Sequence, residues 1–345
     1  MIALEEIRQQ PDILQHWLDT QLESARKFAA EIRKRKVEFV YLAARGTSDH
    51  AGIYAQYVWG ALAGLPVALA APSLFTLYHA APRLKRALVV GISQSGQSPD
   101  IVQVLEEGRR QGAATVAITN VASSPLESAA EYSLRLEAGT ERAVAASKTY
   151  TAQLMAVAAL GALLSGTDAS LKALREVPAA VRETLALEPM IQQMVGAYTG
   201  MDHCLVIGRG FNYCTAREWA LKMKEVTYIH AEAYSSADFL HGPIAIVGEG
   251  DVVMIVAPAG RTEKDFVNLL STLKDRKKAR VLLLSDDSAL THTVQDGILI
   301  PDTVPEWLTP IVGIVPAQLF SVHLAGALGL NPDAPRGLQK VTRTL

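Results

Sequence analysis

Short apolar runs alternate with helical patterns along the whole chain. In the first half these runs cover residues 37–43, 87–92 and 114–119, and each ends in a polar stretch that leads into a helical pattern. Buried strands alternating with helices predict a parallel, doubly wound sheet with helices on both faces. Ligands of such sheets bind beyond the carboxyl ends of the strands, so the polar stretches are the first places to look for a binding site.

The same pattern returns in the second half of the chain. Residues 204–210 repeat residues 40–46, including an Arg-Gly pair 164 positions later, and residues 251–256 match residues 87–92 at the same offset. Two copies of one α/β unit are the simplest explanation. We therefore predict two tandem doubly wound, flavodoxin-like domains.

Segments outside the repeats complete the predicted organisation. We expect five parts: an N-terminal helical arm at 1–34, a first domain at 35–170, a linker helix at 171–194, a second domain at 195–330 and an irregular tail at 331–345. Tails are commonly disordered, but one that lies across an active site is the alternative.

The loop at 93–98 is the best candidate for anion binding. It contains three hydroxyls, two carboxamides and Gly96, and it precedes a helix, a combination that suits a phosphate monoester. The alternative is a serine-rich turn in which Ser98 caps the helix before Pro99. The density of hydroxyls favours phosphate, although the loop contains no basic residue.

Candidate groups for proton transfer lie in residues 218–243. Glu218, Lys222 and Glu225 are spaced at i, i+4 and i+7 on a predicted helix and would share one face. The following residues look irregular and polar up to His241, which precedes Gly-Pro. Carboxylate, ammonium and imidazole together can move protons on a small metabolite. A solvated ion pair and a turn histidine are the alternatives.

The segment 141–148 either faces a ligand or belongs to a helix N-terminus.

Composition limits the class of ligand and the compartment. The chain has 345 residues, 49% hydrophobic and 20% charged, with a formal net charge of −2. This charge offers no basic surface for nucleic acid or an anionic membrane, so we expect a small ligand.

The cysteines and the N-terminus indicate the compartment. Only Cys204 and Cys214 occur, which fits a reducing compartment, although a single disulfide between them stays possible. The acidic N-terminus does not resemble a signal peptide, and the apolar run at 154–164 is too short to span a bilayer. We predict a cytoplasmic protein.

Several short motifs resemble one known family. They are Ser93-Gln94-Ser95-Gly96, Val144-Ala145-Ala146-Ser147-Lys148, Leu221-Lys222-Met223-Lys224-Glu225, His230-Ala231-Glu232-Ala233, His241-Gly242-Pro243 and the ending through Lys340. In this order they resemble the double sugar-isomerase (SIS) domain, in particular the isomerase half of glutamine:fructose-6-phosphate aminotransferase and the stand-alone glucosamine-6-phosphate deaminases.

The resemblance implies specific roles for residues of this chain. It implies a phosphate site made from Ser93, Gln94, Ser95 and Ser98, with Ser48 and Val144 near the sugar. It also implies that Glu225 moves a proton between C1 and C2, Lys222 stabilises the enediol(amine), His241 opens the ring and Lys340 reaches the sugar. In the family the histidine comes from the neighbouring subunit, so a homodimer is implied; no cofactor and no metal is expected.

The resemblance also narrows the expected reaction. No Cys near the N-terminus can attack glutamine, so we expect no glutaminase activity. The predicted reaction is hydrolytic deamination of glucosamine 6-phosphate to fructose 6-phosphate and ammonia. The alternatives are a phosphosugar isomerase or a deglycase acting on a related amino sugar, and a non-catalytic phosphosugar-binding regulator. No helix-turn-helix domain precedes the first repeat, which lowers the regulator alternative.

Overall fold

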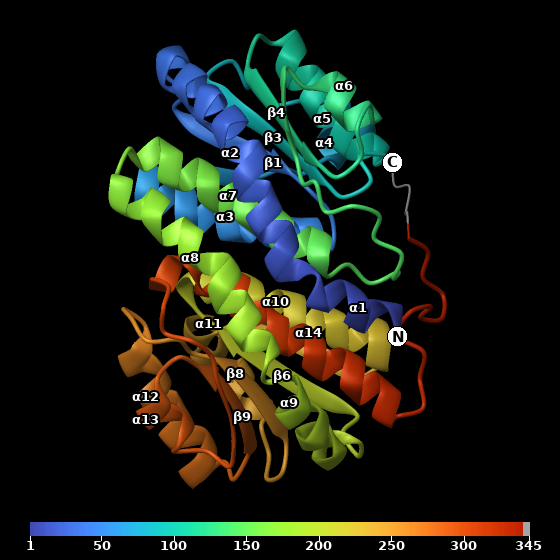
Figure 1. Cartoon of the computed structure of the whole chain (residues 1–345), viewed down its shortest axis with the longest axis vertical. Helices are drawn as coiled ribbons and strands as arrows, with labels where there is room; N and C mark the ends of the chain where they lie inside the picture. Colours follow the sequence, from blue (N-terminus) through green and yellow to red (C-terminus); the bar gives the residue numbers. More distant parts are fainter. Residues whose placement is uncertain (341–345) are drawn as a thin grey trace. The chain divides into compact units, whose positions relative to one another are not determined.

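A computed structural model describes residues 1–340 of the protein and divides the chain into two compact units. Among these residues, the first unit contains Gln9–Glu141, Ala146–Arg175 and the pair Gln339 and Lys340; the second contains Met1–Arg8, Arg142–Ala145 and Glu176–Leu338. Each unit has one five-stranded parallel sheet with flanking helices (Figure 1). The two tandem α/β domains expected from the sequence are therefore confirmed. The domain limits given above stay a prediction.

The sheet of the first unit has the strand order β2-β1-β3-β4-β5. Its strands are β1 (Phe39–Ala43), β2 (Val67–Leu69), β3 (Ala87–Ser93), β4 (Ala114–Thr119) and β5 (Tyr132–Arg135). All neighbouring strands run parallel. The chain leaves β1 toward β2 on one side and returns to β3 on the other, so the point at which ligands bind in such sheets lies between β1 and β3.

Helices cover both faces of this sheet. They are α2 (Gln10–Arg35), α3 (Thr47–Ala63), α4 (Ser73–Thr76), α5 (Pro99–Arg110), α6 (Pro125–Ala129) and α7 (Lys148–Ser165). Figure 1 shows α2, α3 and α7 gathered on one face, with α4, α5 and α6 on the other. Nearly every residue of α7 is buried, and the Trp59 indole of α3 donates a hydrogen bond to its Val157 carbonyl at 2.9 Å. The apolar run at 154–164 is thus part of a core helix.

The sheet of the second unit repeats this order as β10-β9-β8-β6-β7. Its strands are β6 (His203–Gly208), β7 (His230–Ser235), β8 (Val252–Val256), β9 (Arg280–Ser285) and β10 (Asp296–Leu299). The strand register repeats too: Val40 lies opposite Leu88, and Cys204, 164 positions later, lies opposite Val252. The internal repeat seen in the sequence is therefore a repeat of strand pairing, residue for residue.

The helices of the second unit include one long apolar element. They are α1 (Ile2–Arg8), α9 (Glu188–Met194), η1 (Val195–Tyr198), η2 (Gly210–Asn212), α10 (Tyr213–Lys222), η3 (Met223–Thr227), α11 (Ser236–Leu240), η4 (Pro243–Ile246), α12 (Glu263–Ser271), η5 (Thr272–Arg276), α13 (Ser288–Thr291), η6 (Glu306–Leu308) and α14 (Thr309–Ala327). A further helix, α8 (Asp168–Leu185), precedes α9. The stretch Glu306–Ala327 is long and apolar enough to cross a bilayer, but its apolar window is wholly buried in the protein, as in a core helix.

Four expectations need correction or completion. The N-terminal arm is two helices, which separate at Gln9 because Pro11 occupies the first turn of α2 and has no amide to continue α1. The expectation of an irregular segment before His241 is wrong, since it contains β7 and α11. Residues 331–340 have no helix or strand, as expected for the tail, and residues 341–345 lie outside the described residues. Cys204 and Cys214 are both buried and neither forms a disulfide, so the bridge left open above does not form.

Candidate functional site

The loop between β3 and α5 is tightly folded by its own side chains. Ser93 Oγ accepts a hydrogen bond from the Gly96 amide at 3.1 Å, and Ser95 Oγ accepts one from the Gln97 amide at 3.2 Å. Gly96 has φ of 63°, and a Cβ there would lie 2.6 Å from the Cβ of Ser124. Only glycine fits this position.

Ser98 stands at the N-cap of α5, but its hydroxyl makes no capping hydrogen bond. The alternative is therefore borne out in position, since Ser98 is the N-cap and Pro99 begins the helix, but the Ser98 side chain supplies no cap. The first turn of this twelve-residue helix presents backbone amides and the positive end of the helix dipole beside the loop. That arrangement suits a phosphate group.

Ser48 belongs to the same edge of the sheet. It lies in the first turn of α3, which follows β1, and β1 and β3 are adjacent parallel strands. Ser48 is buried, and its hydroxyl accepts a hydrogen bond from the Gln153 carboxamide of α7 at 3.0 Å. The two helices that follow β1 and β3 thus begin on either side of the switch point.

The first unit also contains a cation that the loop sequence does not reveal. Arg45 follows β1, and its Nε donates a hydrogen bond to Asp100 Oδ2 of α5 at 2.8 Å. Asp100 is fully buried, whereas about half of the Arg45 side chain is exposed. The guanidinium offsets the carboxylate charge two residues from Ser98. The pairing of β1 with β3 is the signal that could have pointed to Arg45.

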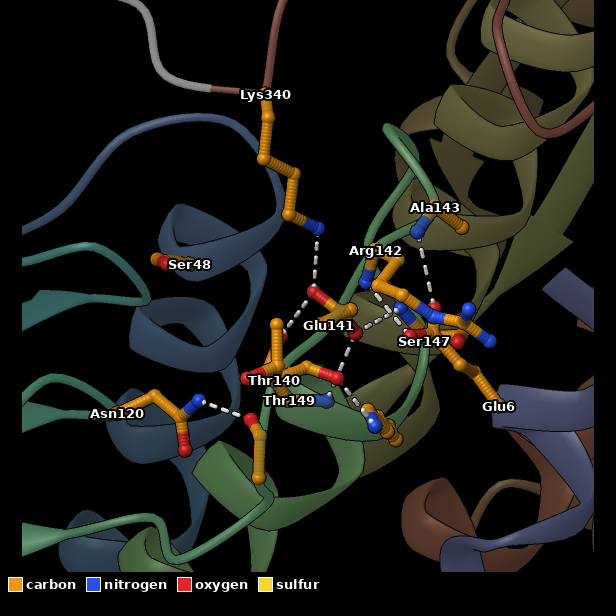
Figure 2. Close-up of polar contacts among 12 residues, drawn as sticks. Glu6, Ser48, Asn120, Thr140, Glu141, Arg142, Ala143, Ser147, Thr149 and Lys340 are labelled. Carbon is orange, nitrogen blue, oxygen red and sulfur yellow. Dashed lines mark hydrogen bonds and ion pairs between the residues drawn. The ribbon is translucent and has the colours of Figure 1, made fainter. Parts of the chain in front are cut away.

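Glu141 is a second residue that the sequence did not single out. Its buried carboxylate accepts hydrogen bonds from the Ser147 amide at 2.9 Å, the Thr149 amide at 3.1 Å and the Thr149 hydroxyl at 2.8 Å. The Lys340 ammonium binds the same carboxylate at 2.7 Å (Figure 2). In this structure the tail lysine is therefore held by Glu141. The only sequence signal was a glutamate just ahead of the Val144 motif.

In the second unit, Lys222 lies between two carboxylates. Its ammonium is 3.4 Å from Glu218 Oε1 and donates a hydrogen bond to Glu225 Oε2. The exposed fractions of the Lys222, Glu218 and Glu225 side chains are 5%, 0% and 22%. Burial by itself would lower the pKa of Lys222, but the charges of Glu225 and Glu218 outweigh it and raise that pKa. The alternative of a solvated ion pair is therefore wrong.

Glu225 sits on η3, a single π-helical turn that continues α10. Such turns are rare and often occur at functional sites. Because α10 connects two parallel strands, η3 lies at the edge of the sheet where β7 begins. Glu225 is the most exposed member of the cluster and so the one that can meet a ligand.

Val144 lies in the loop Arg142–Ala145, which belongs to the second unit. Ala145 packs in a buried cluster with Val226, the residue after Glu225. The Val144 amide donates a hydrogen bond to the Asp333 carbonyl at 3.4 Å. This loop therefore docks on the turn that carries Glu225.

His241 is exposed at the end of α11. Within residues 1–340 its ring makes no hydrogen bond or ion pair, so the structure does not join it to Glu225. Leu240, its neighbour in the chain, and Ile246, five residues further on, are 51% and 59% exposed. Among the same residues no group of three His, Cys, Asp or Glu side chains could hold a metal ion.

Comparisons with known proteins place these features in a family. The SIS domain model matches residues 32–163 and 198–328. Over 343 residues, 98% of this chain, the sequence is 36% identical to glutamine–fructose-6-phosphate aminotransferase [isomerizing] of Aquifex aeolicus, of which it covers 57%. The chain thus spans little more than half the length of the curated relatives it matches.

Solved structures give the same picture. A candidate phosphosugar isomerase from Silicibacter pomeroyi has a TM-score of 0.87 and 32% identity, with 96% of this chain and all of that one covered. The C-terminal domain of glucosamine-fructose-6-phosphate aminotransferase from Francisella tularensis has a TM-score of 0.88 and 28% identity, with 97% and 98% covered. The chain therefore belongs to the SIS domain family, with one SIS domain on each of its two parallel sheets.

Proposed function

We propose that this protein is a phosphosugar aldose-ketose isomerase that converts glucosamine 6-phosphate and water into fructose 6-phosphate and ammonia. The observation that carries the proposal is the buried Lys222 ammonium fixed between Glu218 and the partly exposed Glu225. A carboxylate beside a fixed cation can take a proton from carbon while the cation stabilises the charge that develops.

The phosphoryl group of the substrate binds the loop between β3 and α5 in this proposal. The hydroxyls of Ser93, Ser95 and Ser98, the Gln94 side chain and the amides at the start of α5 supply hydrogen bonds. Arg45 offsets the Asp100 charge, which would otherwise repel a phosphate dianion.

The chemical steps follow from the second unit. His241 opens the sugar ring, which leaves an aldehyde at C1 and the amine at C2. Glu225 removes the C2 proton and returns it to C1, while Lys222 stabilises the negative charge on O1 of the enolamine. The product has an imine at C2; water adds to that carbon, the C–N bond breaks, and ammonia leaves with fructose 6-phosphate. During this cycle Lys340 leaves its ion pair with Glu141 and binds the sugar instead.

We further propose a cytoplasmic homodimer in which His241 acts in the partner's active site. The exposed Leu240, next to His241, and Ile246, five residues after it, support an interface there, because interfaces between subunits bury large apolar side chains. Mixing Glu225→Gln and His241→Gln subunits tests this arrangement. If the histidine crosses the interface, hybrid dimers contain one intact site, and the mixture recovers about one quarter of wild-type activity. No recovery would show that both residues act within one subunit.

The reaction itself is tested by incubating the purified protein with glucosamine 6-phosphate. We expect equal amounts of ammonia and fructose 6-phosphate. If neither product forms, deamination is rejected. The isomerising relatives make an isomerase or deglycase for a related amino sugar the second candidate. A panel of hexose and hexosamine 6-phosphates separates these activities. A regulator would bind these compounds and show no turnover with any of them.

A further inference from the structure

Glu6 of α1 is a buried carboxylate that the proposed reaction does not use. It is 1% exposed, and its two oxygens accept hydrogen bonds from the amides of Arg142 at 2.6 Å and Ala143 at 3.1 Å (Figure 2). The next amide, that of Val144, donates to the Asp333 carbonyl at 3.4 Å. Three successive amides of the loop Arg142–Ala145 are therefore anchored.

The same loop is fixed on its other side by packing. Ala145 is buried with Val226 and Ala325, and the partly buried Leu330 packs against them. Val226 follows Glu225 on η3. Glu6 thus sets the position of the loop against the turn that carries the proposed base. The Asp333 side chain accepts the amides of Ile2 and Ala3 at 2.9 and 2.8 Å, which holds α1 in place.

A carboxylate is an unusual choice for a purely structural contact. Burying it costs several kcal/mol unless its oxygens are bonded, whereas an apolar side chain would dock α1 without that cost. What a carboxylate provides is a fixed geometry, because two charge-assisted hydrogen bonds determine both the distance and the orientation of the two amides.

We propose that Glu6 is a positioning residue for substrate recognition. It holds the loop so that Val144 meets the sugar of a hexosamine phosphate, and it touches no substrate itself. The inference rests on the proposed function, in which Val144 meets the sugar. It assigns to α1 a role in sugar affinity that does not extend to phosphate affinity.

Glu6→Gln is the test, and Glu5→Gln is the matched control. Glutamine keeps the size of Glu6 but has one accepting oxygen, so one of the two loop amides loses its partner. Glu5 is the neighbouring residue and contacts the Arg142 guanidinium at 3.2 Å, but both side chains are more than half exposed. Such a pair contributes little.

Three measurements are made on the full chain: affinity for glucosamine 6-phosphate, affinity for inorganic phosphate, and hydrogen exchange of the peptide containing Arg142–Ala145. For Glu6→Gln we expect affinity for the sugar phosphate to fall about tenfold, the size of one lost charge-assisted hydrogen bond, with phosphate affinity unchanged and loop exchange faster. Glu5→Gln should match wild type in all three. If Glu6→Gln fails to fold, Glu6→Asp, which keeps both oxygens on a shorter side chain, replaces it.

Two results would overturn this inference and leave the proposed function unaffected. One is faster loop exchange with wild-type sugar affinity, which would make Glu6 merely structural. The other is an equal loss of sugar phosphate and inorganic phosphate affinity, which would indicate general destabilisation. If the wild-type protein bound no hexose or hexosamine phosphate, the proposed function would be wrong and the inference would fail with it.

Discussion

Replacing Lys222 by methionine separates the structural and chemical contributions of the Glu218–Lys222–Glu225 cluster. The substitution removes the cation beside Glu218, whose side chain is fully buried. Breaking a buried ion pair by removing one partner costs about 3–5 kcal/mol, because the remaining charge stays in a poorly solvating environment. We therefore expect Lys222→Met to lower the free energy of unfolding by that amount.

The double variant Glu218→Gln/Lys222→Met removes the buried charge as well. A neutral, well-packed replacement of a buried pair is often as stable as the original, so we expect stability within about 1 kcal/mol of wild type. Turnover should be absent from both the single and the double variant, because the cation that stabilises the enolamine is missing. Glu225→Gln, in contrast, keeps the Lys222–Glu218 pair and should lose activity by several orders of magnitude with little change in stability.

Urea denaturation read by tryptophan fluorescence measures these differences, since Trp219 is fully buried in α10 three residues before Lys222. A lower midpoint with an unchanged slope reports lost stability. Hydrogen exchange of the α10 peptide assigns the loss to the second unit. The reasoning fails if Lys222→Met lies within about 1 kcal/mol of wild type, or if the double variant is no more stable than the single one.

Three further predictions concern acid stability, thiol reactivity and the tail. The hydrogen bond from Arg135 is the main cause that lowers the pKa of Glu127 from 4.5 to about 2. The stability that the ionised Glu127 contributes is complete above pH 4.5 and is lost as the pH falls toward 2. The difference in free energy of unfolding between wild type and Glu127→Gln should therefore shrink over this range. Burial raises the pKa of Cys204 to about 12; mass spectrometry should therefore find it unmodified by iodoacetamide in mildly alkaline buffer until the protein is unfolded. Glu141→Gln keeps an acceptor for the Ser147 and Thr149 amides but removes the negative charge that binds Lys340. Trypsin should therefore cleave after Lys340 faster in this variant than in wild type. Equal cleavage rates would contradict the pairing.

The central strands of both sheets could be predicted from the sequence because they are buried on both faces and appear as continuous apolar runs. The edge strands could not. β2, β5, β7 and β10 each have one partner strand and partly exposed residues, so their sequences lack such runs. The same reason made the segment before His241 look irregular.

The candidate site divides in a similar way. Hydroxyl-rich loops and i, i+4 charges are local patterns, which is why the loop at 93–98 and the Lys222 cluster could be proposed from sequence. Burial of that cluster could not, because it depends on α14 and the sheet packing around α10. Glu6 could not be found either, since its partners are backbone amides 136 and 137 residues away, and backbone amides carry no sequence signal.

The hydrogen bonds from Ile2 and Ala3 to Asp333 have a practical consequence for anyone who handles the protein. A purification tag or fusion partner joined ahead of Met1 begins one residue from Ile2, whose amide binds Asp333 in the segment that leads to Lys340. A bulky or mobile group at that junction can therefore disturb the segment around Asp333 as well. Kinetic constants from N-terminally tagged material should therefore be compared with those of protein from which the tag has been cleaved.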